Sequence, residues 1–142
     1  MGKVKNILGT KPSVIISVEP NTTVYAAIEL MCEKNIGGLL ILENDQLVGI
    51  FTERDYARKI ILKGKSSKEA KIAEVMTRNP FTVSSDSSIE QCMEMMSDKN
   101  IRHLPVVDQG KLVGMISIGD VVKQIIQDQK GIIEHLESYM TH

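Results

Sequence analysis

The chain has 142 residues, of which 42% are hydrophobic and 25% are charged, and its formal net charge is -1 at pH 7. These values exclude disordered and collagen-like classes. Because no apolar run approaches about 18 residues and no signal-peptide pattern opens the chain, we expect a soluble cytoplasmic protein with no membrane partner. An aromatic content of 4% and balanced charge also exclude nucleic acid as the expected partner, since such binding uses basic surfaces and aromatic stacking.

The first half of the chain predicts a strand, a helix, a hairpin and a second helix. Residues 14–18 are mostly β-branched and lie between two prolines, which is typical of a short strand. Thr22 can cap the helix that follows, whose apolar residues recur at helical spacing. They are Val24, Ala27, Ile28 and Met31. Residues 39–42 and 47–51 predict a β-hairpin around a polar turn, and a second helix begins near Asp55.

The second half repeats this order. Residues 63–71 are polar and lack periodicity, so they predict a linker between two copies. Residues 14–62 align with residues 79–127 without a gap, and 13 of the 49 pairs are identical, which indicates a duplication. Ser87 and Glu90 predict a capping box in the second copy. We therefore expect an α+β fold in which two tandem β-α-β-β-α repeats pack with pseudo-twofold symmetry.

The cysteines, histidines and acidic residues predict neither a metal site nor catalysis. Cys32 and Cys92 lie in apolar helical patterns, so we expect both thiols to be buried. No ligand spacing relates the histidines to each other or to a cysteine; they are His103, His135 and His142. No nucleophile with its base stands at a catalytic spacing. We expect a protein that is not an enzyme and that requires no cofactor.

Two motifs of equal spacing follow the hairpins: Gly49-x-x-Thr52-x-x-Asp55 and Gly114-x-x-Ser117-x-x-Asp120. With the run Arg102-His103-Leu104-Pro105 and the order of elements, they closely resemble the cystathionine β-synthase (CBS) domain family. The pair resembles a Bateman module of the small stand-alone kind. The resemblance implies one module over residues 1–142: a repeat at 4–62, the linker at 63–71, a second repeat at 72–127 and a C-terminal helix at 128–142.

The resemblance also implies a function and a partner. Such modules are regulatory and bind an adenosine-containing molecule in the clefts between the repeats. The expected ligands are AMP, ADP, ATP, NAD(H) and S-adenosylmethionine. Because no effector domain is attached, the regulated enzyme is expected to be a separate chain.

In this family the motif aspartate typically holds the ribose hydroxyls, and the preceding Thr or Ser faces ribose or phosphate. A carboxylate accepts two hydrogen bonds from a cis diol, and a helix start favours an anion. The other repeat usually encloses the adenine, so each of two sites draws on both repeats. Site A combines Thr52, Arg54, Asp55, Asn79, Phe81, Ile101 and His103. Site B combines Ser117, Asp120, Lys11, Val14, Ile16, Ile36, Gly37 and Gly38.

The two sites differ in charge. Arg54 and His103 belong to site A, whereas their equivalents in site B are glycines. We therefore expect the tighter phosphate contact at site A. Arg102 is assigned to either site, and Lys11 is expected to reach a phosphate in site B.

Spacing alone leaves a structural alternative open. Ser or Thr followed three residues later by an acid also caps helices, and such a cap stabilises a protein by about 1 kcal/mol. Both motifs are equally explained as caps. The alternative function is therefore a structural dimerisation module without a specific ligand.

The C-terminal segment predicts a contact between subunits. Its seam positions, apolar except for one glutamine, are spaced 4, 3, 4, 3 and 4 residues apart, as in a helix that packs on a partner helix. They are Val122, Ile126, Gln129, Ile133, Leu136 and Met140. We expect a homodimer to which this segment contributes, the alternative being a segment that folds back on its own subunit.

Overall fold

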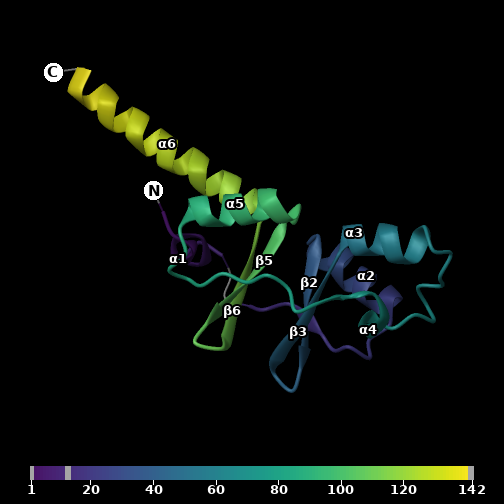
Figure 1. Cartoon of the computed structure of the whole chain (residues 1–142). Coiled ribbons are helices and arrows are strands. Elements are labelled where there is room, and N and C mark those ends of the chain that lie inside the picture. Colours follow the sequence, from purple (N-terminus) through teal and green to yellow (C-terminus); the bar gives the residue numbers. More distant parts are fainter. Residues whose placement is uncertain (1, 12–13, 141–142) are drawn as a thin grey trace. The chain divides into compact units, whose positions relative to one another are not determined.

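The computed structural model describes residues 2–11 and 14–140, which form two compact units (Figure 1). The first-repeat unit spans residues 14–81, and the second-repeat unit joins the residues up to 13 with those from 82 onward. Each unit mixes strands and helices, so the expected α+β class is confirmed. Within the described ranges, no helix is long and apolar enough to cross a membrane.

The first-repeat unit is built on a sheet with strand order β1-β2-β3-β4. Its strands are β1 (Ser17–Val18), β2 (Gly38–Glu43), β3 (Gln46–Thr52) and β4 (Thr77–Arg78). Its helical segments are α2 (Val24–Lys34), α3 (Glu53–Asp55), the π-helix η1 (Tyr56–Ile61) and α4 (Ile72–Val75). β2 and β3 form the predicted antiparallel hairpin, and β1 pairs parallel to β2. The expected strand at 14–18 is shorter than predicted, because only its last two residues reach β2.

The second-repeat unit contains the equivalent hairpin and three helices. They are β5 (His103–Asp108), β6 (Lys111–Ser117), α1 (Val4–Leu8), α5 (Ile89–Lys99) and α6 (Ile118–Met140). A single parallel bridge between Val83 and Val106 replaces the first strand. These residues are equivalent to Val18 and Ile41, which pair between β1 and β2. Both units therefore keep the order predicted from the repeat.

The first helix of each repeat buries most of the predicted face. Its buried members are Val24, Ala27, Met31, Ile89, Cys92 and Met96. Ile28 is only partly buried, and its equivalent in the second repeat, Met93, is 43% exposed, so the prediction was wrong for Met93. Thr23 and Ser88 cap these helices, each one residue after the predicted cap, because their extended backbone lets the hydroxyl accept from the N–H three residues on. Gln91, rather than Glu90, returns its side chain to the N–H of Ser88.

The two cysteines differ in environment. Cys92 is buried in the core of the second-repeat unit, and burial raises the pKa of its thiol. Cys32 is exposed, so the expectation of a buried thiol was wrong for this residue. The neighbouring Met31 faces the core. Because successive residues of a helix point about 100° apart, Cys32 points away from the core.

Each unit contains the short helix that opens the other repeat, and we call α1 and α4 the exchanged helices. α1 opens the first repeat in sequence but packs in the second-repeat unit, where the N–H of Val4 donates to the carbonyl of Ser87 at 2.9 Å. α4 opens the second repeat but packs in the first-repeat unit, where the N–H of Ile72 donates to the carbonyl of Thr22 at 2.8 Å. Thr22 and Ser87 are equivalent in the repeat, so both units bind the exchanged helix in the same way.

The segment between the repeats is attached to the first-repeat unit. In the stretch 63–71, which the sequence predicts as a linker, Ala70 is buried and its carbonyl accepts from the N–H of Val24 at 2.9 Å. The boundary between the two compact units therefore lies between residues 81 and 82, whereas the sequence predicts that the second repeat begins at residue 72. The C-terminal helix continues α6 without a break at residue 128.

Each unit has its own hydrophobic core, filled by equivalent residues. Leu39, Ile41 and Phe51 of the first repeat correspond to Leu104, Val106 and Ile116 of the second, and all six are fully buried. The exchanged helices complete both cores with Ile72, Val75, Val4 and Ile7. The core of each unit thus depends on a helix from outside its own repeat.

The glycine of the first motif leaves room for β4. A Cβ atom at Gly49 would lie 2.7 Å from Sδ of Met76 and 2.9 Å from the carbonyl oxygen of Thr77. At the equivalent Gly114 it would meet only Cδ2 of Leu8, at 3.0 Å, and that side chain can rotate. We predict that Gly49→Ala lowers the free energy of unfolding by about 1–3 kcal/mol, whereas Gly114→Ala changes it by less than about 1 kcal/mol. Urea denaturation measures both, and equal losses would contradict the prediction.

Candidate functional site

Each motif lies where the second strand of a hairpin turns into a helix. Oδ2 of Asp55 accepts from the N–H of Thr52 at 2.9 Å, and Oδ2 of Asp120 accepts from the N–H of Ser117 at 2.8 Å. In return, the N–H of each aspartate donates to the hydroxyl of the same Thr or Ser, at 3.4 and 3.2 Å. Both motifs are therefore helix caps, as the structural alternative predicts.

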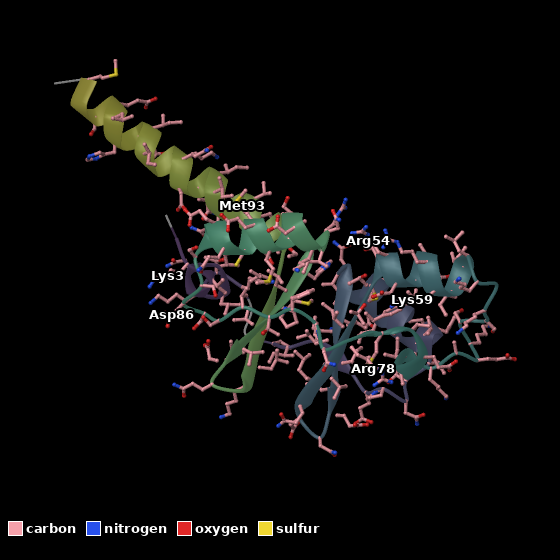
Figure 2. All side chains as sticks on the ribbon, in the orientation of Figure 1. Lys3, Arg54, Lys59, Arg78, Asp86 and Met93 are labelled. Atoms are coloured by element: carbon pink, nitrogen blue, oxygen red, sulfur yellow. The ribbon has the colours of Figure 1, made fainter. Side chains whose placement is uncertain are left out.

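The carboxylate of Asp55 is buried and has partners on both oxygens. Its Oδ1 accepts from Nζ of Lys59 at 3.0 Å and from the hydroxyl of Thr77 at 3.2 Å. Lys59 also donates to the carbonyl of Val75 at 2.9 Å. Arg54 and Lys59 both lie on the helical segment that follows β3 (Figure 2). Because each carboxylate oxygen accepts about two hydrogen bonds, a ligand hydroxyl reaches Asp55 only by displacing one of these partners.

The carboxylate of Asp120 is more open. Its side chain is 20% exposed, against 12% for Asp55. Oδ2 accepts from the N–H of Ser117 and from Nζ of Lys11, both at 2.8 Å, and Lys11 also donates to the carbonyl of Met115 at 2.9 Å. Oδ1 has no hydrogen-bond partner in the described part of the chain. It is thus the open acceptor of the two motifs.

The pKa of Asp120 reflects two opposing effects. Burial by itself raises the pKa of this carboxyl. The hydrogen bonds from Lys11 and Ser117, together with the charge of Lys11, outweigh burial and hold the pKa below its ordinary value. Asp120 therefore carries its negative charge in the neutral pH range and attracts hydrogen-bond donors.

Two partners of Asp55, Lys59 and Thr77, were missed in the sequence, and Lys11 was expected to contact a phosphate of the ligand rather than Asp120 itself. Lys59 follows Asp55 by four residues, and this spacing in a helix could have predicted the ion pair. Thr77 and Lys11 carry no such signal. The contact between Lys11 and Asp120 spans 109 residues and exists because α1 packs in the second-repeat unit.

Within the first-repeat unit, two predicted glycines lie beside the motif. Gly38 pairs with Thr52 across the hairpin, and the carbonyl of Gly37 accepts from the first N–H of α3 at 3.1 Å. Arg54, which precedes Asp55, is half-buried. The sequence assigns these glycines to the site of the other motif.

The second-repeat unit shows the same arrangement with larger side chains. His103 pairs with Ser117 across the hairpin, and the carbonyl of Arg102 accepts from the N–H of Ile118 at 2.9 Å. The side chain of Arg102 is exposed, whereas Ile101 packs against the core. Arg102 and His103 thus lie next to Ser117 within their own unit.

The remaining predicted residues all belong to the first-repeat unit. Ile16 and Ile36 are partly buried against its core. Val14, Asn79 and Phe81 are exposed, and Asn79 takes the left-handed backbone conformation with φ of 49°. The combination of residues from both repeats in sites A and B stays a prediction.

Two further features bear on ligand class. Among residues 2–11 and 14–140, no group of three or more His, Cys, Asp or Glu side chains is placed to hold a metal ion. A hollow of about 580 Å³ lies at the turn end of the first-repeat hairpin, opposite the motif. Its lining includes three glutamates, so it does not suit a phosphate: Glu19, Pro20, Asn21, Glu43, Asn44, Lys71, Ala73 and Glu74.

Comparison with known proteins gives a consistent result. The family model of the CBS domain matches residues 4–62 and 72–127. Over 123 residues the chain is 39% identical to the CBS domain-containing protein CBSX3, mitochondrial, of Arabidopsis thaliana. This match covers 83% of the chain but 60% of the relative, so the chain spans less than two thirds of that protein.

Solved structures agree in fold. A protein with CBS domains from Burkholderia ambifaria MC40-6 is 48% identical, with a TM-score of 0.87 over 90% of this chain and 96% of that one. The CBS domain pair of protein MJ0100, solved in complex with 5'-methylthioadenosine and S-adenosyl-L-methionine, is 32% identical. Its TM-score is 0.79 over 90% of this chain and 98% of that one.

The lowered pKa of Asp120 predicts an acid-dependent contribution to stability. The pKa of Asp120 is lower in the folded chain than in the unfolded chain. The ionised carboxylate therefore stabilises the fold fully at pH values above the unfolded pKa, and this stabilisation is lost as the pH falls through the folded pKa. Asp120→Asn should therefore lower the free energy of unfolding by about 1–2 kcal/mol at pH 7, and by much less near pH 3. Urea denaturation at both pH values measures the difference. Asp98→Asn, at an exposed position of α5, is the control; an equal loss at both pH values contradicts the prediction.

Proposed function

Because this chain belongs to the CBS domain family, we propose that it is a regulatory module that binds an adenosine nucleotide, namely AMP, ADP, ATP or NAD(H), and performs no catalysis. The observation that carries this proposal is the capped carboxylate at a helix start in each repeat, with an open oxygen at Asp120. The related pair solved with two adenosine-containing molecules supports adenosine as the common part of the ligand.

The carboxylate of Asp120 suits the cis diol of a ribose. Oδ1 can accept one hydroxyl as it stands, and Oδ2 can accept the second when Lys11 moves away. The hydroxyl of Ser117 lies beside the carboxylate at the start of α6. The positive end of this long helix favours the negative charge of a phosphate.

Lys11 is the residue that such a ligand must displace. Its ammonium group holds both Asp120 and the carbonyl of Met115. A ligand that carries a phosphate offers the released ammonium a new anion, whereas adenosine offers none. The ion pair therefore favours phosphorylated ligands over the bare nucleoside.

The site at Asp55 is the more closed of the two. A ribose there competes with Lys59 and Thr77 for Oδ1. We propose that Arg54, Arg102 and His103 bind the phosphate of the ligand. A ligand that binds at Asp55 must supply enough binding free energy to break the hydrogen bond of this carboxylate with Lys59 or Thr77.

We also propose that the module acts as a homodimer on a separate enzyme. The cytoplasm stays the expected location, although the Arabidopsis relative is named mitochondrial.

Isothermal titration calorimetry of the full chain tests the function. We expect at least one of AMP, ADP, ATP, NADH and S-adenosylmethionine to bind. Asp120→Ala should weaken the binding free energy of that ligand by about 1–3 kcal/mol, since charge-assisted hydrogen bonds are lost. Melting of the unliganded variant separates this effect from loss of the cap. If no nucleotide binds, the structural dimerisation module is the better explanation, and any product formed on incubation contradicts the absence of catalysis.

The role of Lys11 gives a second prediction. Lys11→Met frees Oδ2 of Asp120 and removes a cation, so adenosine should bind several-fold more tightly while the preference for AMP over adenosine falls about tenfold. Competition binding measures both affinities. Lys5→Met, on the exposed face of α1, is the matched control. An unchanged ratio of the two affinities contradicts the proposed displacement.

A further inference from the structure

α6 carries a row of mostly apolar side chains that its own unit does not cover. The helix packs against α5, α1 and β6 near its start and then extends past them (Figure 1). The α6 stripe consists of Val122, Ile126, Gln129, Ile133, Leu136 and Met140. Their spacing places these side chains on one face of the helix.

A different face of α6 packs against the unit. Val121 is fully buried and Ile125 is partly buried against the second-repeat core. Val122 and Ile126, one residue further on, are 45% and 46% exposed. From Gln129 onward every described side chain is exposed. The segment therefore does not fold back on its own subunit, and a row of exposed apolar side chains marks a contact with another molecule.

We propose that the α6 stripe binds the same stripe of a second copy in antiparallel orientation, with the twofold axis at the level of Gly131. Gly131 lies midway along the stripe. The arrangement therefore sets Val122 opposite Met140 of the partner subunit. It also sets Ile126 opposite Leu136 of the partner subunit, so the apolar positions of the two copies meet.

Charge complementarity selects this orientation. Lys123, Lys130 and Glu137 lie along one edge of the stripe. Antiparallel pairing brings this edge against the same edge of the other copy, so Lys123 faces Glu137 of the partner subunit, and the twofold axis produces this contact twice. Near the axis Lys130 lies beside Lys130 of the partner subunit, so one like-charge contact opposes the two ion pairs. A parallel pair sets the charged edge against the opposite edge, which carries Ile125 and Ile132, and forms no ion pair.

The size of the contact predicts a reversible dimer. The stripe spans residues 122–140, about 27 Å of helix, which is fewer than three heptads. Two isolated helices of this length would pair weakly. The start of α6 is already held by its unit, so less conformational entropy is lost on pairing. This surface specifies how the subunits of the proposed homodimer pair, and the pairing does not depend on a bound nucleotide.

Charge reversal in the full chain tests the pairing. Lys123→Glu and Glu137→Lys should each raise the dimer dissociation constant about tenfold, because each turns two attractive contacts into repulsive ones. The double variant restores the contacts with reversed polarity, and its constant should return to within about threefold of the parent value. The two positions are 14 residues apart, about 21 Å along one helix, so rescue cannot arise within a subunit.

Analytical ultracentrifugation measures these constants, and melting temperatures confirm that the variants fold. Glu134→Lys, outside the stripe on the same helix, is the matched control and should leave the constant unchanged. Ile133→Asp should largely dissociate the dimer. A double variant as weak as the single ones overturns the antiparallel pairing, and an unchanged constant in Ile133→Asp overturns the stripe as the interface. A parent that is monomeric at every concentration overturns the homodimer as well, whereas nucleotide binding is judged separately by calorimetry.

Discussion

One hydrogen bond in each repeat sets the geometry of the candidate site: a backbone N–H at the end of a hairpin strand donates to the carboxylate three residues later. The bond fixes where the helix begins and holds the carboxylate at the helix start. Capping and ligand binding are therefore compatible uses of one side chain, because a cap occupies only part of the acceptor capacity of a carboxylate. The groups that contact the remaining acceptor positions of the carboxylate differ between the two repeats.

The exchanged helices α1 and α4 produce this difference. Thr77 follows α4 and closes Asp55 together with Lys59, whereas Lys11 follows α1 and occupies one oxygen of Asp120. Both helices are bound through equivalent backbone contacts, but the residues that follow them are not alike. A duplicated sequence thus gives one closed and one open carboxylate. The open one is held by the ion pair with Lys11, which we propose that a phosphorylated ligand replaces.

α6 connects the open carboxylate with the proposed dimer surface. The helix begins at the cap formed by Ser117 and Asp120, packs against its unit along one face and carries the stripe along another. A single continuous helix is a rigid element, and an element that two sites share is the physical requirement for coupling between them. The proposed ligand site and the proposed dimer surface therefore lie on the same helix.

The sequence by itself determined the repeat, the order of elements, both hairpins, most of the buried helix faces and, to within one residue, the helix caps. These features follow from local periodicity and from hydrogen bonds between residues a few positions apart. Because the sequence is duplicated, the same local patterns occur in both repeats. Only the tertiary structure decided that Cys32 is exposed, that α1 and α4 pack on the other repeat, and that Lys11 and Thr77 reach the motif carboxylates. These contacts join segments far apart in the chain, and their energy comes from burying Val4 and Ile72 in cores that no local pattern specifies.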